Sequence, residues 1–209
     1  MLSKFGRRIA TGPAERIARR LQAWGVTPNG LTYTGFGLTV LTSVVLAEGH
    51  FRWGALLLAV ASVFDTLDGT LARVTSQTSV FGAFIDSTLD RYSESVILLA
   101  LAYYYSRSSG TRTELVLVFV IIVGSLMVSY TRARAEGLDL KVSGGWLQRP
   151  ERVVLLILGL LTGWMQPILW IMAIFTNVSA IQRIYEVYWR TSRAEPEAAR
   201  QPPGDNHPA

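Results

Sequence analysis

Long stretches without a charged residue constrain the fold of this chain more than any other feature. Residues 31–47 and 115–131 carry no charge, and residues 153–182 form an uncharged run of 30 residues. A helix needs about 20 residues to cross the hydrocarbon core of a bilayer. The longest run is therefore expected to form two helices joined by a turn at 163–167, where a glycine and a proline stand. The sequence predicts an all-α integral membrane protein.

Two shorter apolar runs, 53–64 and 95–106, can span a bilayer only if parts of the acidic stretch 65–94 are also helical. Only 17% of the residues are charged, against about 25% in soluble domains. The absence of cysteine excludes disulfides and zinc–thiolate sites. Six transmembrane helices are expected at 30–48, 53–74, 81–106, 113–133, 150–164 and 167–189.

Residues 1–24 alternate hydrophobic and basic side chains and lack the apolar core of a signal peptide. This pattern predicts an N-terminal amphipathic interfacial helix on the membrane surface, with a solvated basic arm as the alternative. The hydrophobic members are Phe5, Ile9, Ile17, Leu21 and Trp24, and the basic members are Arg7, Arg8, Arg16, Arg19 and Arg20.

The distribution of basic residues predicts the topology. Of the 20 Lys and Arg, three (Arg52, Arg107 and Arg112) fall on one face and 17 on the other, which the positive-inside rule places in the cytoplasm. We expect a multi-pass protein of the cell membrane with both termini and the active site cytoplasmic. A net charge of +5 is read as attraction to membrane lipids, not nucleic acid. The expected parts are the amphipathic helix 1–24, a six-helix domain 25–190 and a disordered tail 191–209.

An acidic cluster lies in or next to these membrane segments: Asp65, Asp68, Asp86 and Asp90. A charge at the bilayer centre costs at least about 2.5–3.5 kcal/mol, so the four carboxylates need partners. The first pair is spaced i, i+3 and the second i, i+4, so each pair faces one direction, and a helical hairpin would bring the pairs together. Divalent cations with hard oxygen ligands, Mg²⁺, Mn²⁺ or Ca²⁺, would neutralise them. The alternative is pairing with Arg73 and Arg91.

The pattern Asp65-x2-Asp68-Gly69-x2-Ala72-Arg73, eight residues, Gly82-x3-Asp86-x3-Asp90 resembles the signature of the CDP-alcohol phosphotransferase (phosphatidyltransferase) family. Prenyltransferases with paired Asp-rich motifs lack its glycines and its Ala-Arg pair. The resemblance implies a six-helix membrane enzyme, a homodimer, that transfers a phosphatidyl group from CDP-diacylglycerol to an alcohol and releases CMP. It implies that two Mg²⁺ or Mn²⁺ ions are held by Asp65, Asp68, Asp86 and Asp90, and that Asp90 is also the catalytic base.

The same resemblance implies a set of residues that bind the CDP-lipid: Asn29, Asp68, Gly69, Ala72, Arg73, Ser79 and Gly82. Small residues on the acidic face would leave room for cytidine against the helix backbone, although close helix packing equally favours them. Residues 27–29 also suit a plain helix start, and Ser79 also suits a plain loop.

Arginines in the second half of the chain point to an acceptor that bears a phosphate. Arg183 stands between two isoleucines inside the last expected helix and needs a partner. The motifs around these arginines resemble the phosphatidylinositol phosphate synthases of actinobacteria, whose acceptor is inositol 1-phosphate, although Arg132 stands where a lysine is common. The segment 149–152 could also be shared with archaeal relatives acting on ether lipids. The implied phosphate pocket comprises Ser129, Arg132, Arg149, Arg152 and Arg183.

Three alternatives remain open. Glycerol 3-phosphate as the acceptor (phosphatidylglycerophosphate synthase) would keep the chemistry, because it too carries a phosphate. A cation transporter would use the aspartates as an ion path but does not require the Gly-x2-Ala-Arg pattern. A catalytically inactive scaffold would not need the complete set of four aspartates. Some of the arginines can also be explained as topology markers alone.

Overall fold

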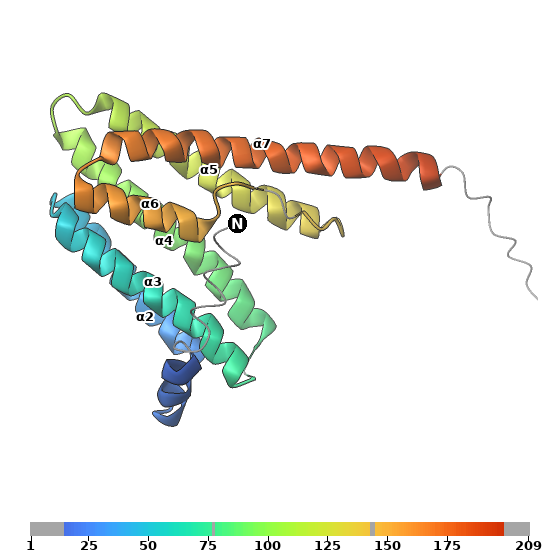
Figure 1. Cartoon of the computed structure of the whole chain (residues 1–209), viewed down its shortest axis with the longest axis horizontal. Coiled ribbons are helices and arrows are strands. Elements are labelled where there is room, and N and C mark those ends of the chain that lie inside the picture. Colours follow the sequence, from blue (N-terminus) through green and yellow to red (C-terminus); the bar gives the residue numbers. More distant parts are fainter. Residues whose placement is uncertain (1–14, 77, 143–144, 199–209) are drawn as a thin grey trace, which may run out of the picture.

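The computed structural model describes residues 15–76, 78–142 and 145–198, and every regular element within these ranges is a helix. A helical stretch at 15–23 precedes the elements labelled in Figure 1. These are α2 (Pro28–Ala47), α3 (Phe51–Val74), α4 (Val80–Arg107), α5 (Arg112–Glu136), α6 (Arg149–Thr162) and α7 (Met165–Ala198). The expected all-α class is confirmed, and each expected helix overlaps an observed one.

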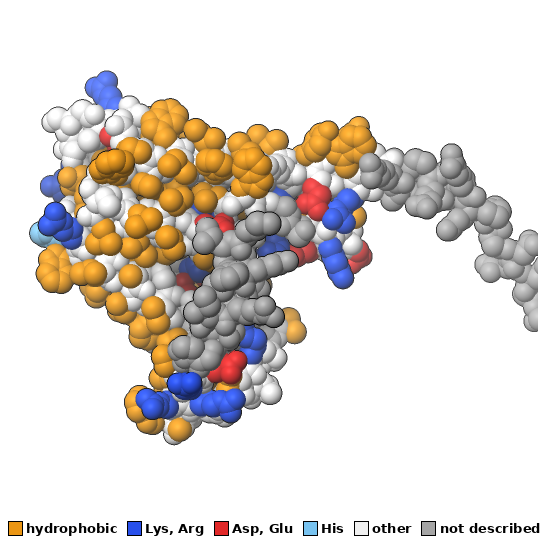
Figure 2. Space-filling model, in the orientation of Figure 1, with side chains coloured by type: hydrophobic (Ala, Val, Ile, Leu, Met, Phe, Trp, Pro, Cys, Tyr) orange, Lys and Arg blue, Asp and Glu red, His pale blue; other side chains and the backbone are white. Residues whose placement is uncertain are grey.

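Four of the helices are long and apolar enough to cross a membrane: α2, α3, α5 and residues 165–192 of α7. The remaining two of the six expected spans do not meet that description within the described chain. Helix α6 has only 14 residues, and α4 carries four charged residues, Asp86, Asp90, Arg91 and Glu94, within a nine-residue stretch. Hydrophobic side chains cover much of the face over α3, α6 and α7, while basic side chains gather at the lower end, around the 15–23 helix (Figure 2).

Local sequence signals set the helix ends. Thr27 caps α2 by accepting a hydrogen bond from the Gly30 N–H at 3.2 Å, and Pro28 occupies the first turn. Ser79 caps α4 in the same way through the Gly82 N–H at 2.9 Å. A turn is confirmed in the expected region, but it is shorter than 163–167: Gly163 ends α6 in the left-handed region at φ +79° and α7 already begins at Met165.

The packing separates the two acidic helices. Helix α2 packs against both α3 and α4, whereas α3 and α4 have no close backbone contact with each other in the described chain. Helix α6 packs on α3, and α5 packs on α7. The main apolar core includes Leu98, Leu101, Ile121 and Leu169. A smaller apolar cluster joins Ala18 of the 15–23 helix to α2 and α3.

The predictions for the two ends of the chain are tested only in part. Of the amphipathic helix expected at 1–24, residues 1–14 lie outside the described residues. The described part is helical, with Arg16, Arg19 and Arg20 exposed and Ala18 buried. Helix α7 continues past the expected end at residue 189 to Ala198, so the boundary expected at 191 lies within it. Residues 199–209 of the expected tail lie outside the described residues.

Candidate active site

The acidic cluster comes from two helices that face each other across a gap. Asp65 and Asp68 lie near the end of α3, and Asp86 and Asp90 lie in the first half of α4. Asp68 is buried, with 4% of its surface exposed. One of its oxygens accepts a hydrogen bond from the Thr32 hydroxyl at 2.8 Å, and the other accepts one from the Gly69 N–H at 2.5 Å. Helix α2 therefore fixes this carboxylate in place.

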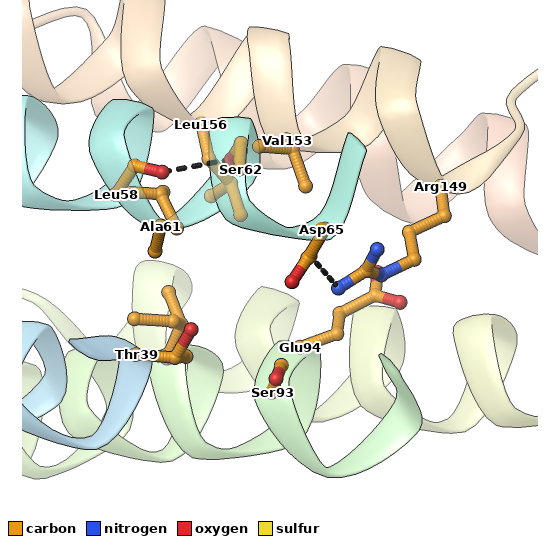
Figure 3. Close-up of a pocket in the computed structure, with 11 residues that line it drawn as sticks. Thr39, Leu58, Ala61, Ser62, Asp65, Ser93, Glu94, Arg149, Val153 and Leu156 are labelled. Carbon is orange, nitrogen blue, oxygen red and sulfur yellow. Dashed lines mark hydrogen bonds and ion pairs between the residues drawn. The ribbon is translucent and has the colours of Figure 1, made fainter. Parts of the chain in front are cut away.

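Arg149, the first residue of α6, bridges the two acidic helices. Its Nη2 lies 2.7 Å from Asp65 Oδ2 on α3, and its Nη1 lies 2.8 Å from Asp90 Oδ1 on α4. Figure 3 shows the guanidinium reaching Asp65, with Glu94 of α4 beside it. The alternative, pairing of the aspartates with Arg73 and Arg91, gives no ion pair among the described residues, although Arg91 attracts Asp86 and Asp90 electrostatically.

Those two arginines instead hydrogen-bond within their own helices. Arg73 donates to the Thr70 hydroxyl at 3.1 Å, and Arg91 donates to the Ser87 carbonyl oxygen. Each points back along its own helix, so the cation that reaches both acidic helices comes from α6.

The cluster is not arranged as a preformed cation cage. Across the described residues, no group of three or more His, Asp or Glu side chains is placed to hold a metal ion. Like-charge repulsion nevertheless links Asp86 to Asp65, Asp68 and Asp90, so carboxylates from both helices face one region. Their oxygen donors fit a hard divalent cation chemically, and Arg149 stands between them.

A cavity of about 210 Å³ opens on one side of the cluster, between α2, α3 and α4. All of the residues expected to bind the CDP-lipid line it: Asn29, Asp68, Gly69, Ala72, Arg73, Ser79 and Gly82. Sequence reasoning missed Thr32 and Thr78, which also line this cavity. For Thr32 the signal was its position one turn after Asn29.

The two glycines of this cavity differ in surroundings. A Cβ on Gly82 would approach the Ser79 hydroxyl to 2.9 Å and Asn29 Oδ1 to 3.2 Å, so close packing requires a small residue there. A Cβ on Gly69 would meet only Arg73 Nη1, at an ordinary 3.5 Å. Packing therefore explains Gly82, whereas it leaves Gly69 unexplained.

A larger cavity of about 620 Å³ opens on the other side, between α4, α5, α6 and α7. All of the residues expected to bind the acceptor phosphate line it: Ser129, Arg132, Arg149, Arg152 and Arg183. Asp90 lies on its wall, and Ala83 of α4 lines both cavities. The acidic cluster is thus reached from two sides.

Arg152 forms a buried ion pair with Glu94. It is 3% exposed, its Nε and Nη2 lie 2.5 and 2.6 Å from the Glu94 carboxylate, and its Nη1 donates to the Leu147 carbonyl at 3.0 Å. Ser125 donates to Glu94 Oε1 at 3.0 Å. Arg152 therefore holds the turn before α6, and a direct phosphate contact would require it to leave Glu94.

Sequence reasoning did not identify Glu94 and Ser125 as partners of the arginines. For Glu94 the signal was its spacing of four residues from Asp90 on the same helix face.

The other arginines of the larger cavity differ in their freedom to move. Arg183 is 5% exposed and donates to the Val128 carbonyl oxygen. It lies against Gly145, where a Cβ would come within 3.3 Å of its Nη2. Arg132 forms only an exposed ion pair with Glu136 at 2.8 Å. Exposed pairs of this kind are worth about 0–1 kcal/mol, so Arg132 can turn toward a ligand at little cost.

The chain is similar to known proteins over most of its length. The sequence model described as CDP-alcohol phosphatidyltransferase matches residues 25–181. An archaetidylinositol phosphate synthase of Pyrococcus horikoshii is 37% identical over 190 residues, covering 89% of this chain and 96% of that protein. A phosphatidylinositol phosphate synthase of Corynebacterium glutamicum is 34% identical, covering 88% of each.

Solved structures show the same fold. The phosphatidylinositol phosphate synthase of Mycobacterium tuberculosis with CDP-diacylglycerol bound superimposes with a TM-score of 0.78 at 28% identity, covering 84% of this chain and 93% of that one. The same enzyme in complex with manganese and citrate gives a TM-score of 0.79, covering 84% of this chain and 88% of that one.

Proposed function

The chain belongs to the CDP-alcohol phosphatidyltransferase family, and on that premise we propose that it transfers the phosphatidyl group of CDP-diacylglycerol to inositol 1-phosphate. The products are phosphatidylinositol phosphate and CMP. One observation carries the choice of acceptor: a cavity that Asp90 lines is also lined by five arginines, at positions 91, 132, 149, 152 and 183.

The lining of the larger cavity suits an acceptor that carries a phosphate monoester. Guanidinium groups bind phosphate through two parallel hydrogen bonds. Arg132 is exposed and can move toward a bound ligand. Arg183 is held against α5 and offers its charge at a fixed position. Free inositol and serine carry no phosphate group that these guanidinium groups could bind in this way. The names of two relatives, an archaetidylinositol phosphate synthase and a phosphatidylinositol phosphate synthase, support inositol as the alcohol of the acceptor.

The smaller cavity is proposed to take the CDP part of the donor. Gly69 leaves open space beside Asp68, and Asn29, Arg73 and Ser79 supply polar groups around it. The M. tuberculosis enzyme of the same fold, solved with CDP-diacylglycerol bound, supports CDP-diacylglycerol as the donor. The pyrophosphate would then lie at the acidic cluster, between the two cavities.

Asp90 is the proposed base because it lines the acceptor cavity and belongs to the acidic cluster. Its carboxylate takes the proton of the acceptor hydroxyl as that oxygen attacks the phosphorus bearing the diacylglycerol. The new P–O bond forms in line as the bond to CMP breaks, and CMP leaves with the bonding electrons. The arginines of the cavity hold the acceptor's own phosphate away from the attacked phosphorus.

Asp65, Asp68, Asp86 and Asp90 are the residues that would hold divalent cations, two Mg²⁺ or Mn²⁺ ions in this proposal. When bound, such ions neutralise charge on the pyrophosphate. The all-oxygen donor set supports this, as does the manganese named in the M. tuberculosis structure. Thr32 keeps Asp68 oriented for that role.

The proposed placement in the membrane has six spans, α2 to α7, within a domain at 25–190. The N-terminal segment 1–24 lies on the cytoplasmic surface, and α7 extends beyond this domain to Ala198. The exposed arginines at 16, 19 and 20 and the bias of basic residues toward one face support this orientation. A homodimer is proposed from the family resemblance, and crosslinking in membranes tests it.

The test of the reaction is release of CMP by the purified protein in detergent with CDP-diacylglycerol and Mg²⁺. Inositol 1-phosphate should support release, and Asp90→Asn should abolish it. Free inositol and serine should not support release. Release with glycerol 3-phosphate instead would keep the aspartate chemistry and refute the proposed acceptor.

A further inference from the structure

Arg149 belongs to both halves of the site. Its guanidinium is paired with Asp65 and Asp90, two of the proposed cation ligands, at 2.7 and 2.8 Å. The same side chain lines the acceptor cavity together with Ser129 and Arg132. No other arginine in the described chain forms an ion pair with the four signature aspartates.

These contacts place Arg149 in competition with a divalent cation. Mg²⁺ binds carboxylate oxygens at about 2.0–2.1 Å, so a cation shared by α3 and α4 would stand where the guanidinium now joins Asp65 to Asp90. Two positive charges that close repel each other. The same carboxylates therefore cannot fully serve both partners.

The backbone at Arg149 is fixed, but its side chain can move. The α6 start is held by a capping box, in which the Gln148 N–H donates to Glu151 Oε2 at 2.7 Å, and by the buried Arg152–Glu94 pair. The Nε of Arg149 is buried without a hydrogen-bond partner among the described residues. The present contacts of Arg149 thus leave its Nε–H without an acceptor. A position of the side chain in which this group is hydrogen-bonded would be favoured.

We propose that Arg149 couples cation binding to acceptor binding. Cations on the aspartates displace the guanidinium from Asp65 and Asp90, and it then binds the phosphate of the acceptor. This inference rests on the proposed function. The coupling is reciprocal, because each ligand must raise the affinity for the other by the same factor. The acceptor phosphate is therefore held tightly only when the catalytic cluster is loaded.

The test measures binding, with CDP present throughout and protein in detergent. Titration calorimetry gives the affinity for inositol 1-phosphate with and without Mn²⁺, and electron paramagnetic resonance gives the affinity for Mn²⁺. In the wild type, Mn²⁺ should tighten acceptor binding by roughly 5- to 150-fold, the usual range of coupling between sites. Arg149→Gln should bind Mn²⁺ more tightly than the wild type, and its acceptor affinity should no longer depend on Mn²⁺.

Two further variants make the result specific. Arg132→Gln removes a cation from the same cavity that does not contact the aspartates, so it should weaken acceptor binding and keep the Mn²⁺ effect. Arg149→Lys retains the charge and should restore part of the coupling, which loss of folding could not explain. An unchanged Mn²⁺ affinity in Arg149→Gln, with the acceptor still responding to Mn²⁺, would overturn the proposal.

Parallel titrations with glycerol 3-phosphate separate this inference from the proposed function. Binding of glycerol 3-phosphate alone, strengthened by Mn²⁺, would refute the inositol acceptor and support the coupling. Binding of either phosphate with an affinity independent of Mn²⁺ in the wild type would refute the coupling and leave the acceptor assignment standing.

Discussion

The buried ion pair between Glu94 and Arg152 gives the sharpest prediction of stability. The side chains are 8% and 3% exposed, and two hydrogen bonds of 2.5 and 2.6 Å join them. Replacing either residue by methionine leaves the other charge buried without its counter-ion. We expect each single variant to lose about 3–5 kcal/mol of unfolding free energy, the usual cost of breaking such a pair.

The double variant should be more stable than either single variant. Replacing a whole buried pair with apolar residues of similar length is often neutral, because no uncompensated charge remains. Glu94→Met with Arg152→Met should therefore recover most of the loss, apart from the hydrogen bonds to Ser125 and the Leu147 carbonyl. Those two hydrogen bonds account for the part of the loss that is not recovered.

Unfolding in mixed detergent, followed by the fluorescence of the six tryptophans, measures these free energies. Arg190→Met is the matched control, because Arg190 forms an exposed pair with Glu186 at 2.7 Å, and its loss should not exceed about 1 kcal/mol. Losses at Glu94 and Arg152 that simply add in the double variant would refute the reasoning, since two residues that act as a pair cannot be independent.

Three further predictions follow from the same structure. Gly69→Ala should fold normally, because its Cβ would meet no protein atom closer than 3.5 Å. It should raise the KM for CDP-diacylglycerol, because the methyl group would occupy the space proposed for the donor; normal kinetics would refute the binding role. Gly124→Ala should lower the unfolding temperature, because a Cβ there would lie 2.5 Å from the Thr176 hydroxyl where α5 packs on α7, and overpacking costs about 1–3 kcal/mol; an unchanged temperature would contradict that packing. Thr32→Val should reduce activity at limiting Mg²⁺ and recover at high Mg²⁺, because Asp68 loses the 2.8 Å hydrogen bond that orients it; a deficit that Mg²⁺ does not relieve would count against this role.

The helices could be predicted from local spacing, and the residues of each cavity from the family resemblance. Apolar runs and breaks such as Gly163 define the helices. The separation of the aspartates by three and four residues determines which face of each helix is acidic. The two cavities are lined by the residues that the resemblance implied.

The pairing of charges could not be predicted, because it joins residues far apart in the chain. Arg149 and Asp65 are 84 positions apart, and Arg152 and Glu94 are 58 apart. Local spacing offered only Arg73 and Arg91 as the alternative partners of the acids, whereas α6 packs on α3 and brings Arg149 to them. Arg152, expected at the phosphate, is held by Glu94 for the same reason.

A competition among four acceptors measures the acceptor specificity of the protein. The protein receives CDP-diacylglycerol, Mg²⁺ and four acceptors at equal concentration: inositol 1-phosphate, glycerol 3-phosphate, inositol and serine. The lipid products are then quantified by mass spectrometry. The ratio of products gives the ratio of kcat/KM values. Phosphatidylinositol phosphate should dominate the spectrum. A spectrum dominated by phosphatidylglycerophosphate, phosphatidylinositol or phosphatidylserine would contradict the account of the arginine-lined cavity.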